Sequence, residues 1–93
     1  MLHQVILHDI LWVEAFADYI KIYTENNMLI ALSTMKAMEA KLPDTIFARV
    51  HRSYIVNLKK IDNIDLSSVH IGSKCIPIGN IHRESLMKKV NLL

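Results

Sequence analysis

The sequence predicts a mainly β (α+β) domain of about seven short, mostly antiparallel strands in small sheets, with two short helices. Short runs rich in β-branched and aromatic residues recur between turn signals. Residues 35–42 show the three- and four-residue apolar spacing of a helix, and a second, final helix is expected over residues 81–90. The chain has 93 residues, of which 52% are hydrophobic and only two are Gly and two Pro, and this favours one folded domain with no room for a second.

The expected strands follow from local chemistry. Residues 19–24 alternate and are mostly β-branched or aromatic, and a turn at 25–27 joins them to their antiparallel partner. The apolar run 10–13 is too short for a helix, and residues 14–18 form a polar, partly aromatic loop. Pro77 has no N–H for a ladder, so its strand lies at an edge or ends there. The expected strands are residues 5–7, 19–24, 28–32, 47–50, 54–64, 69–71 and 74–78.

Both helices carry terminal signals. Ser33 or Thr34 can cap the first helix, because either hydroxyl can accept from a free backbone amide. Pro43 ends that helix. Asn80 can cap the second helix. The buried positions are expected to be Met35, Met38 and Leu42 in the first helix, and Ile81, Leu86 and Val90 in the second. The outward positions of the second helix are expected to be Arg83, Lys88 and Lys89.

The stretch at residues 47–57, FARVHRSYIVN, places a polar turn of His51, Arg52 and Ser53 between two apolar runs. No acidic residue occurs from 45 to 61, whereas four basic residues fall there. A buried frame that presents a small basic turn is a plausible surface for reading an anion.

Charge is divided unevenly along the chain. Residues 1–46 carry three Lys against six acidic residues, a net charge of −3, and residues 47–93 carry eight Lys/Arg against three acidic residues, a net charge of +5. A basic half beside an acidic half indicates a polyanionic partner on one face. The alternative is a solvated surface with uneven charge.

The central stretch resembles the signature of LytTR (LytR/AlgR-type) DNA-binding domains of bacterial response regulators, and the resemblance spans residues 5–90. The family implies small antiparallel sheets that reach DNA through loops. It also implies two such domains on direct repeats in successive major grooves, and a phosphorylated receiver domain upstream. Residues 1–93 are then a single LytTR-type domain from the C-terminal part of such a regulator. Further pieces that agree in order are Asp9-Ile10, Trp12-Val13-Glu14-Ala15, Asp18-Tyr19-Ile20-Lys21-Ile22, Lys41-Leu42-Pro43 and Ile76-Pro77-Ile78.

Arg52 is the strongest candidate for a DNA contact. In the family, the position after the signature His points at DNA, and Arg offers a rigid fork of donors for phosphate or a guanine edge. Ser53 and the local amides can take a phosphate oxygen, although His51 and Ser53 can equally serve to stabilise their own turn. Lys59 and Lys60, outward at the start of their segment, are further candidates for phosphate contact.

Two other loops match DNA-facing positions of the family. In the first, Tyr19 and Lys21 are better candidates than Asp18, which would repel phosphate and either forms the turn, reads a cytosine amine or orients a neighbour. In the second, Gly79-Asn80 stands where the family typically has Ser-Arg, so base reading there must fall to Asn80, His82 or Arg83, or be lost. Asn80 can bond adenine, but helix capping competes for the same side chain.

Catalysis is not indicated. The chain has no G-x-S-x-G, H-E-x-x-H or glycine-rich phosphate loop, and its five histidines lack ligand spacing, so no metal or other cofactor is expected. Cys75, the single cysteine, suggests core packing in a strand and a reducing cytoplasm. No signal peptide and no membrane-spanning run are present.

The predicted function is sequence-specific double-stranded DNA binding, as the effector domain of a bacterial two-component transcriptional regulator that can dimerise on DNA. The alternative is a protein-interaction module that keeps the fold with weak or no DNA binding, suggested by Gly79 and by the small net charge of +2.

Overall fold

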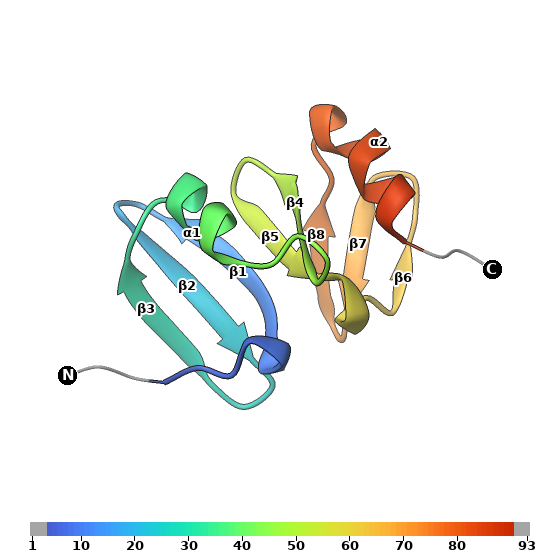
Figure 1. Ribbon diagram of the computed structural model, residues 1–93. Coiled ribbons are helices and arrows are strands. Elements are labelled where there is room, and N and C mark those ends of the chain that lie inside the picture. Colours follow the sequence, from blue (N-terminus) through green and yellow to red (C-terminus); the bar gives the residue numbers. More distant parts are fainter. Residues whose placement is uncertain (1–3, 91–93) are drawn as a thin grey trace.

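The computed structural model describes residues 4–90 and contains eight strands in two antiparallel sheets, with two α-helices (Figure 1). The first sheet has the order β3-β2-β1-β5-β4 and the second β6-β7-β8. The mainly β prediction is confirmed. The first-sheet strands are β1 (Ile10–Phe16), β2 (Tyr19–Thr24), β3 (Met28–Leu32), β4 (Phe47–His51) and β5 (Tyr54–Asn57). The remaining elements are β6 (Asn63–Ile64), β7 (Ser68–Ile71), β8 (Lys74–Pro77), α1 (Met35–Lys41), α2 (Asn80–Lys89) and two 3-10 helices, η1 (Leu7–Asp9) and η2 (Leu58–Lys60).

The N-terminal part differs from the sequence prediction in two ways. Residues 5–7 do not form a strand, because the chain enters η1 at Leu7. The expected polar loop at 14–18 is instead mostly strand, since β1 continues to Phe16. Glu14 lies opposite Lys21 of β2 and opposite Tyr54 of β5. A strand paired on both sides gains ladder hydrogen bonds that outweigh local polarity. The β2–β3 hairpin was predicted correctly.

The segment predicted as continuous strand through residue 64 breaks after β5. Asn57 Oδ1 accepts a hydrogen bond of 2.9 Å from the amide of Lys59, and this cap starts η2. Only Asn63–Ile64 of the remaining stretch pairs, as β6 against β7. An Asn side chain that bonds the backbone two residues on is a turn former, which competes with extension of the strand.

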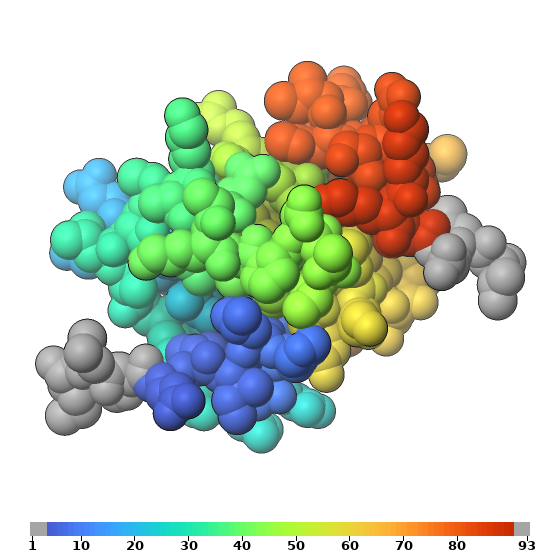
Figure 2. Space-filling model, viewed as in Figure 1, coloured from blue at the N-terminus to red at the C-terminus, as the bar shows by residue number. Residues whose placement is uncertain are grey.

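Two hydrophobic clusters lie on the two faces of the first sheet. In β5, Ile55 faces one cluster and Val56 the other. The first is covered by α1 and the second by the β6–β8 sheet and α2, as Figure 1 shows. Figure 2 shows α1 and the chain that follows it lying across the front of the molecule, next to α2, where Lys89 donates to the carbonyl of Asp44. The first cluster includes Ile10, Val13, Ile20, Ile22, Met35, Leu42, Phe47 and Ile55.

The helix predictions are confirmed for α1 and partly wrong for α2. Thr34 caps α1, accepting from the amide of Ala37 at 3.0 Å. At α2 the N-cap residue is Gly79, which has no side chain to cap with, and Asn80 is the first helical residue. Ile81 is 88% exposed rather than inward, whereas Leu86 is buried and Val90 packs on the second cluster. The helix begins one residue earlier than predicted. Ile81 lies five residues before Leu86, which is about 140° around a helix of 3.6 residues per turn, so the two side chains cannot both face the core.

The β6–β7 connection is held by Asp65. Its carboxylate accepts from the ring of His70 at 2.7 Å and from the amides of Ser67 and Ser68. The His70 hydrogen bond, followed by that of Ser67, lowers the pKa of Asp65 from 3.8 to about 2. Because the folded-state pKa is depressed, the stabilisation is present above the ordinary value and is lost as pH falls towards about 2.

Phe47→Ala should destabilise the fold before it affects any surface. Phe47 heads β4 and is 3% exposed within the first cluster. Deletion of a buried aromatic side chain typically costs ~3–5 kcal/mol, comparable with the whole stability of many small domains. Thermal melting followed by circular dichroism measures this. Phe16→Ala, at an exposed position, is the control, and an unchanged melting temperature for Phe47→Ala would contradict the packing.

Candidate nucleic-acid interface

Three loops meet along one edge of the molecule: the β1–β2 turn, the β4–β5 turn and the start of α2. The Ala15 amide donates to the carbonyl of Ser53 at 2.9 Å, which joins the first two loops. The Gly79 amide donates to the carbonyl of Val50 at 2.7 Å, which joins α2 to β4. In Figure 1 these three loops lie along the upper side of the molecule. Loops far apart in sequence therefore present one composite surface.

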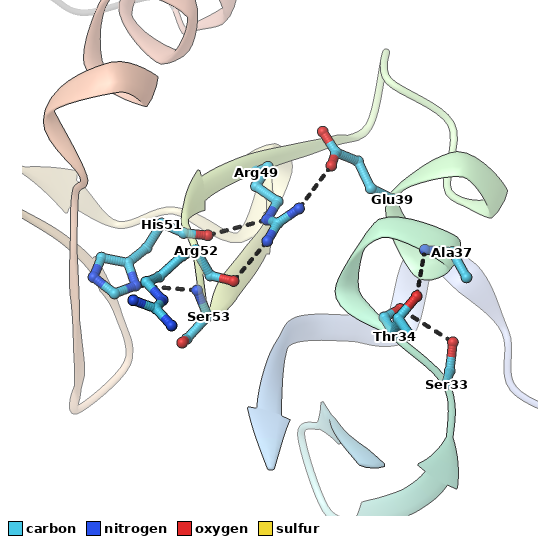
Figure 3. A network of polar contacts seen from close by, with 8 residues as sticks. All are labelled: Ser33, Thr34, Ala37, Glu39, Arg49, His51, Arg52 and Ser53. Atoms are coloured by element: carbon cyan, nitrogen blue, oxygen red, sulfur yellow. Dashed lines mark hydrogen bonds and ion pairs between the residues drawn. The ribbon is translucent and has the colours of Figure 1, made fainter. Parts of the chain in front are cut away.

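The β4–β5 turn consists of Arg52 and Ser53, with His51 paired opposite Tyr54. The amide of Ser53 donates to His51 Nδ1 at 3.1 Å, so the neutral ring carries its proton on Nε2. Arg49 donates from Nε to the carbonyl of His51 at 3.2 Å and from Nη2 to the carbonyl of Arg52 at 2.6 Å (Figure 3). The hydrogen bond from the Ser53 amide to the His51 ring shows that His51 stabilises its own turn, as the predicted alternative states.

The side chain of Arg52 is exposed and makes no hydrogen bond or ion pair within residues 4–90. Its backbone, in contrast, is bound on the carbonyl side by Arg49. A fixed backbone that carries an unengaged guanidinium is suited to bidentate recognition of phosphate or guanine.

The β1–β2 turn is tight and carries exposed aromatic residues. Ala17 occupies the left-handed region with φ of 54°, between the paired residues Phe16 and Tyr19. Lys21 Nζ lies 4.1 Å from the centroid of the Phe16 ring, in a cation–π contact that restrains the ammonium. Tyr19 and Lys21 therefore lie at the composite surface, together with the exposed Asp18.

The start of α2 brings Asn80, His82 and Arg83 to the same edge. Asn80 is exposed, and because it does not cap the helix, its amide remains available for a ligand. His82 and Arg83 are half-buried. A Cβ built on Gly79 would lie 3.4 Å from His82 Cδ2 and 3.7 Å from His51 Cα, so this loop packs directly against the β4–β5 turn.

Lys59 and Lys60 are not part of this edge. They lie on η2, beyond the opposite end of β5, which at about 3.3 Å per residue separates them from Ser53 by more than about 13 Å. The structure therefore brings together eight of the ten predicted residues and leaves the two lysines apart. Those eight are Tyr19, Lys21, His51, Arg52, Ser53, Asn80, His82 and Arg83.

Two residues of the edge were missed by sequence reasoning. Phe16 was placed in a polar loop but supports Lys21, and Ile81 was assigned to the core but projects beside Asn80. The sequence spacing could have revealed Ile81, since it lies five residues before Leu86 and therefore on another side of the helix.

The described part of the chain shows neither a metal-binding cluster nor a membrane-spanning helix. No three His, Cys, Asp or Glu residues gather where they could hold a metal ion. Among residues 4–90 no helix is long and apolar enough to cross a membrane. Cys75 is exposed, so the prediction that it packs in the core is wrong: β8 is a sheet edge, and its alternate residues face away from the second cluster.

The fold and this edge define a small two-sheet β domain whose three loops bring Lys21, Arg52 and Arg83 to one surface. Residues 1–91 match the family described as the LytTr DNA-binding domain. The chain is also 30% identical over 91 residues to the sensory transduction protein LytT of Bacillus subtilis, covering 90% of this chain and 37% of that protein. A LytTr DNA-binding domain of a Bacillus cereus response regulator superposes with a TM-score of 0.83 at 21% identity, covering 95% of this chain and 86% of that one.

The chain belongs to the LytTR family of DNA-binding domains. The predicted resemblance is thereby confirmed. The chain spans 37% of the length of its curated relative LytT.

Replacing both Lys59 and Lys60 by Gln should weaken all duplexes alike. Because they lie off the three-loop edge and lysine is a point charge, any contribution that they make is attraction to phosphate and not the reading of a base. The slope of log K against log salt should flatten by up to about two units, while the ratio of cognate to random affinity stays constant. Fluorescence anisotropy over a salt series measures both. A changed sequence preference with an unchanged slope would refute the assignment.

Proposed function

We propose that this domain binds double-stranded DNA sequence-specifically, as the effector domain of a bacterial two-component transcriptional regulator. The observation that carries the proposal is the Arg52 turn, in which the backbone is bound internally and the side chain is exposed. Family membership supports DNA as the ligand, and the sensory transduction protein LytT supports a signalling role. The domain, residues 1–93, acts without cofactor or catalysis, in the cytoplasm and downstream of a receiver domain.

Each loop has a distinct part in the proposed complex. Arg52 reads a base edge in the major groove, and Ser53 and His51 Nε2–H contact the adjacent phosphate. Lys21 contacts phosphate from the first loop, with Tyr19 beside it. Asn80 bonds an adenine, with His82 and Arg83 nearby. Two copies bind direct repeats in successive major grooves.

The test begins with the selection of bound sequences from a random duplex pool. The selected duplex and a scrambled duplex are then titrated over a salt series. A sequence-specific domain retains a large affinity ratio at every salt concentration, and its affinity falls steeply with salt because counterions are released. Failure to enrich any sequence, together with a flat salt response, would overturn the proposal.

A second candidate function, protein interaction, is favoured by β3. This edge strand, Met28–Leu32, has no charged residue, and Ile30 and Leu32 are 53% and 76% exposed. Unprotected edges of this kind pair with other strands. In antiparallel self-pairing centred on Ile30, Met28 of one copy would lie opposite Leu32 of the other, so a second copy fits the edge. Such a dimer has two-fold symmetry and is distinct from two copies aligned on a direct repeat.

Ile30→Lys separates these candidates. A charge at the centre of the edge should abolish β3-mediated dimerisation, measured by sedimentation equilibrium. Leu66→Lys, at an exposed leucine of the β6–β7 connection, is the matched control. A monomeric wild-type chain, or a dimer insensitive to Ile30→Lys, would remove the second candidate.

Arg52→Lys tests base reading directly. Lysine keeps the charge and removes the fork, so it should cost ~1–3 kcal/mol on the selected duplex and almost nothing on random DNA. The measurement is the pair of dissociation constants at one salt concentration. Equal losses on both duplexes would make Arg52 a phosphate contact, and no loss on either would exclude it from the interface.

A further inference from the structure

Arg49 lies in the basic central stretch, yet its guanidinium is engaged inside the protein. Nε and Nη2 donate to the carbonyls of His51 and Arg52, and Nη1 donates to Glu39 Oε1 of α1 at 3.0 Å (Figure 3). The Arg49 side chain is only 20% exposed. Although the sequence places Arg49 among the basic residues, its donors point at the turn and at a carboxylate, leaving it poorly placed for phosphate.

The Arg52–Ser53 turn lacks the usual backbone support of a two-residue hairpin. The favoured turns require positive φ at one or both central residues, because their twist then matches that of the strands. Within residues 4–90, Ala17 is the only non-glycine residue with positive φ. The β4–β5 register is also irregular between Arg49 and His51. Such a turn depends on side chains to select one conformation.

We propose that Arg49, fixed by Glu39 of α1, is the positioning residue that aims Arg52, and that Arg49 itself does not contact DNA. Its fork holds the carbonyls on both sides of the Arg52 Cα, the two points that set the direction of that side chain. The inference rests on the proposed function, and it makes base selectivity depend on α1, which lies outside the three loops.

The placement of Glu39 follows from the packing of α1. Thr34 caps the helix, and the buried Met35 and the half-buried Met38 pack on the first cluster. This packing fixes the position of Glu39 relative to β4. Its side chain is 50% exposed. An ion pair this exposed contributes little to folding. Its removal can therefore alter the aim of Arg52 without unfolding the domain.

Glu39→Leu, which removes both the charge and the Oε1 acceptor that glutamine would keep, gives different results for the two explanations. As a pure charge change, it removes an acidic group and should strengthen binding to every duplex alike. If Glu39 positions the turn, the ratio of selected to random affinity should fall about five-fold or more, since a well-aimed bidentate contact is worth about that much discrimination.

Asp44→Asn is the matched control. Asp44 and Glu39 line the same crevice of about 50 Å³ beside Arg49, and the Asp44 carboxylate makes no hydrogen bond or ion pair within the described residues. The control should leave the affinity ratio constant. If Glu39→Leu and Asp44→Asn each shift the affinity for both duplexes by the same factor, the proposal is overturned.

Arg49→Lys and Arg49→Gln test whether Arg49 touches phosphate. Loss of a phosphate contact in Arg49→Gln would lower the salt slope by about 0.9, and Arg49→Lys would restore it. A positioning role predicts an unchanged slope in both variants and a reduced affinity ratio in both, because lysine cannot span two carbonyls and a carboxylate. If these variants melt below the assay temperature, Glu39→Leu remains decisive.

A measurement without DNA keeps this inference separate from the proposed function. The Ser53 amide donates to His51 Nδ1, so its hydrogen exchange reports the order of the turn. Exchange at Ser53 should be several-fold faster in Glu39→Leu than in wild type and unchanged in Asp44→Asn. Unchanged exchange in Glu39→Leu would contradict the positioning role even if DNA binding were normal. Faster exchange would support it even if no DNA sequence were enriched.

Discussion

The pairing of β1 with β5 is the constraint on which the other features of this domain depend. Asn57, the one buried polar residue in the part of the chain described, fixes it: Nδ2 donates to the carbonyl of Ile10 at 2.9 Å and to that of His8 at 3.3 Å. A buried amide left without partners costs about 1–3 kcal/mol, so only one register satisfies it. That register places Glu14 opposite Tyr54 and brings the β1–β2 and β4–β5 turns to the same edge.

The β1–β5 strand pair also divides the hydrophobic core into two clusters. Because side chains alternate along β5, Ile55 and Val56 anchor clusters on opposite faces, one under α1 and one under the second sheet. The second sheet in turn carries α2 to Val50, where the Gly79 amide closes the contact. The third loop reaches the edge through this packing, although some 25 residues separate it from the β4–β5 turn in the sequence.

The electrostatics of the edge are more modest than its sequence suggests. Arg49 is engaged with Glu39 and with two carbonyls, and Lys21 is held over Phe16, leaving Arg52 as the exposed guanidinium of the central turn. A surface with few cations gains less from counterion release and depends more on geometry. Fixed placement of a few donors is the physical basis on which such a surface can distinguish sequences.

The sequence by itself determined the features that depend on neighbouring residues. The β2–β3 hairpin follows from alternation, the ends of α1 from Thr34 and Pro43, and the edge position of β8 from Pro77. The basic turn at Arg52 was visible for the same reason, as a polar interruption between apolar anchors. Each of these signals acts over a few residues, where local sterics and hydrogen bonding decide.

Only the tertiary structure decided the features that depend on distant partners. Residues 14–16 became strand because two other strands pair with them, and Cys75 became exposed because nothing covers its side of β8 within residues 4–90. α2 begins at Asn80, directly after the contact of Gly79 with Val50, and its packing through Leu86 leaves Ile81 exposed. Arg49 counts as a surface cation in the sequence, because its partner Glu39 lies ten residues away on another element. Hydrogen bonds and burial gained across such separations outweigh local preference.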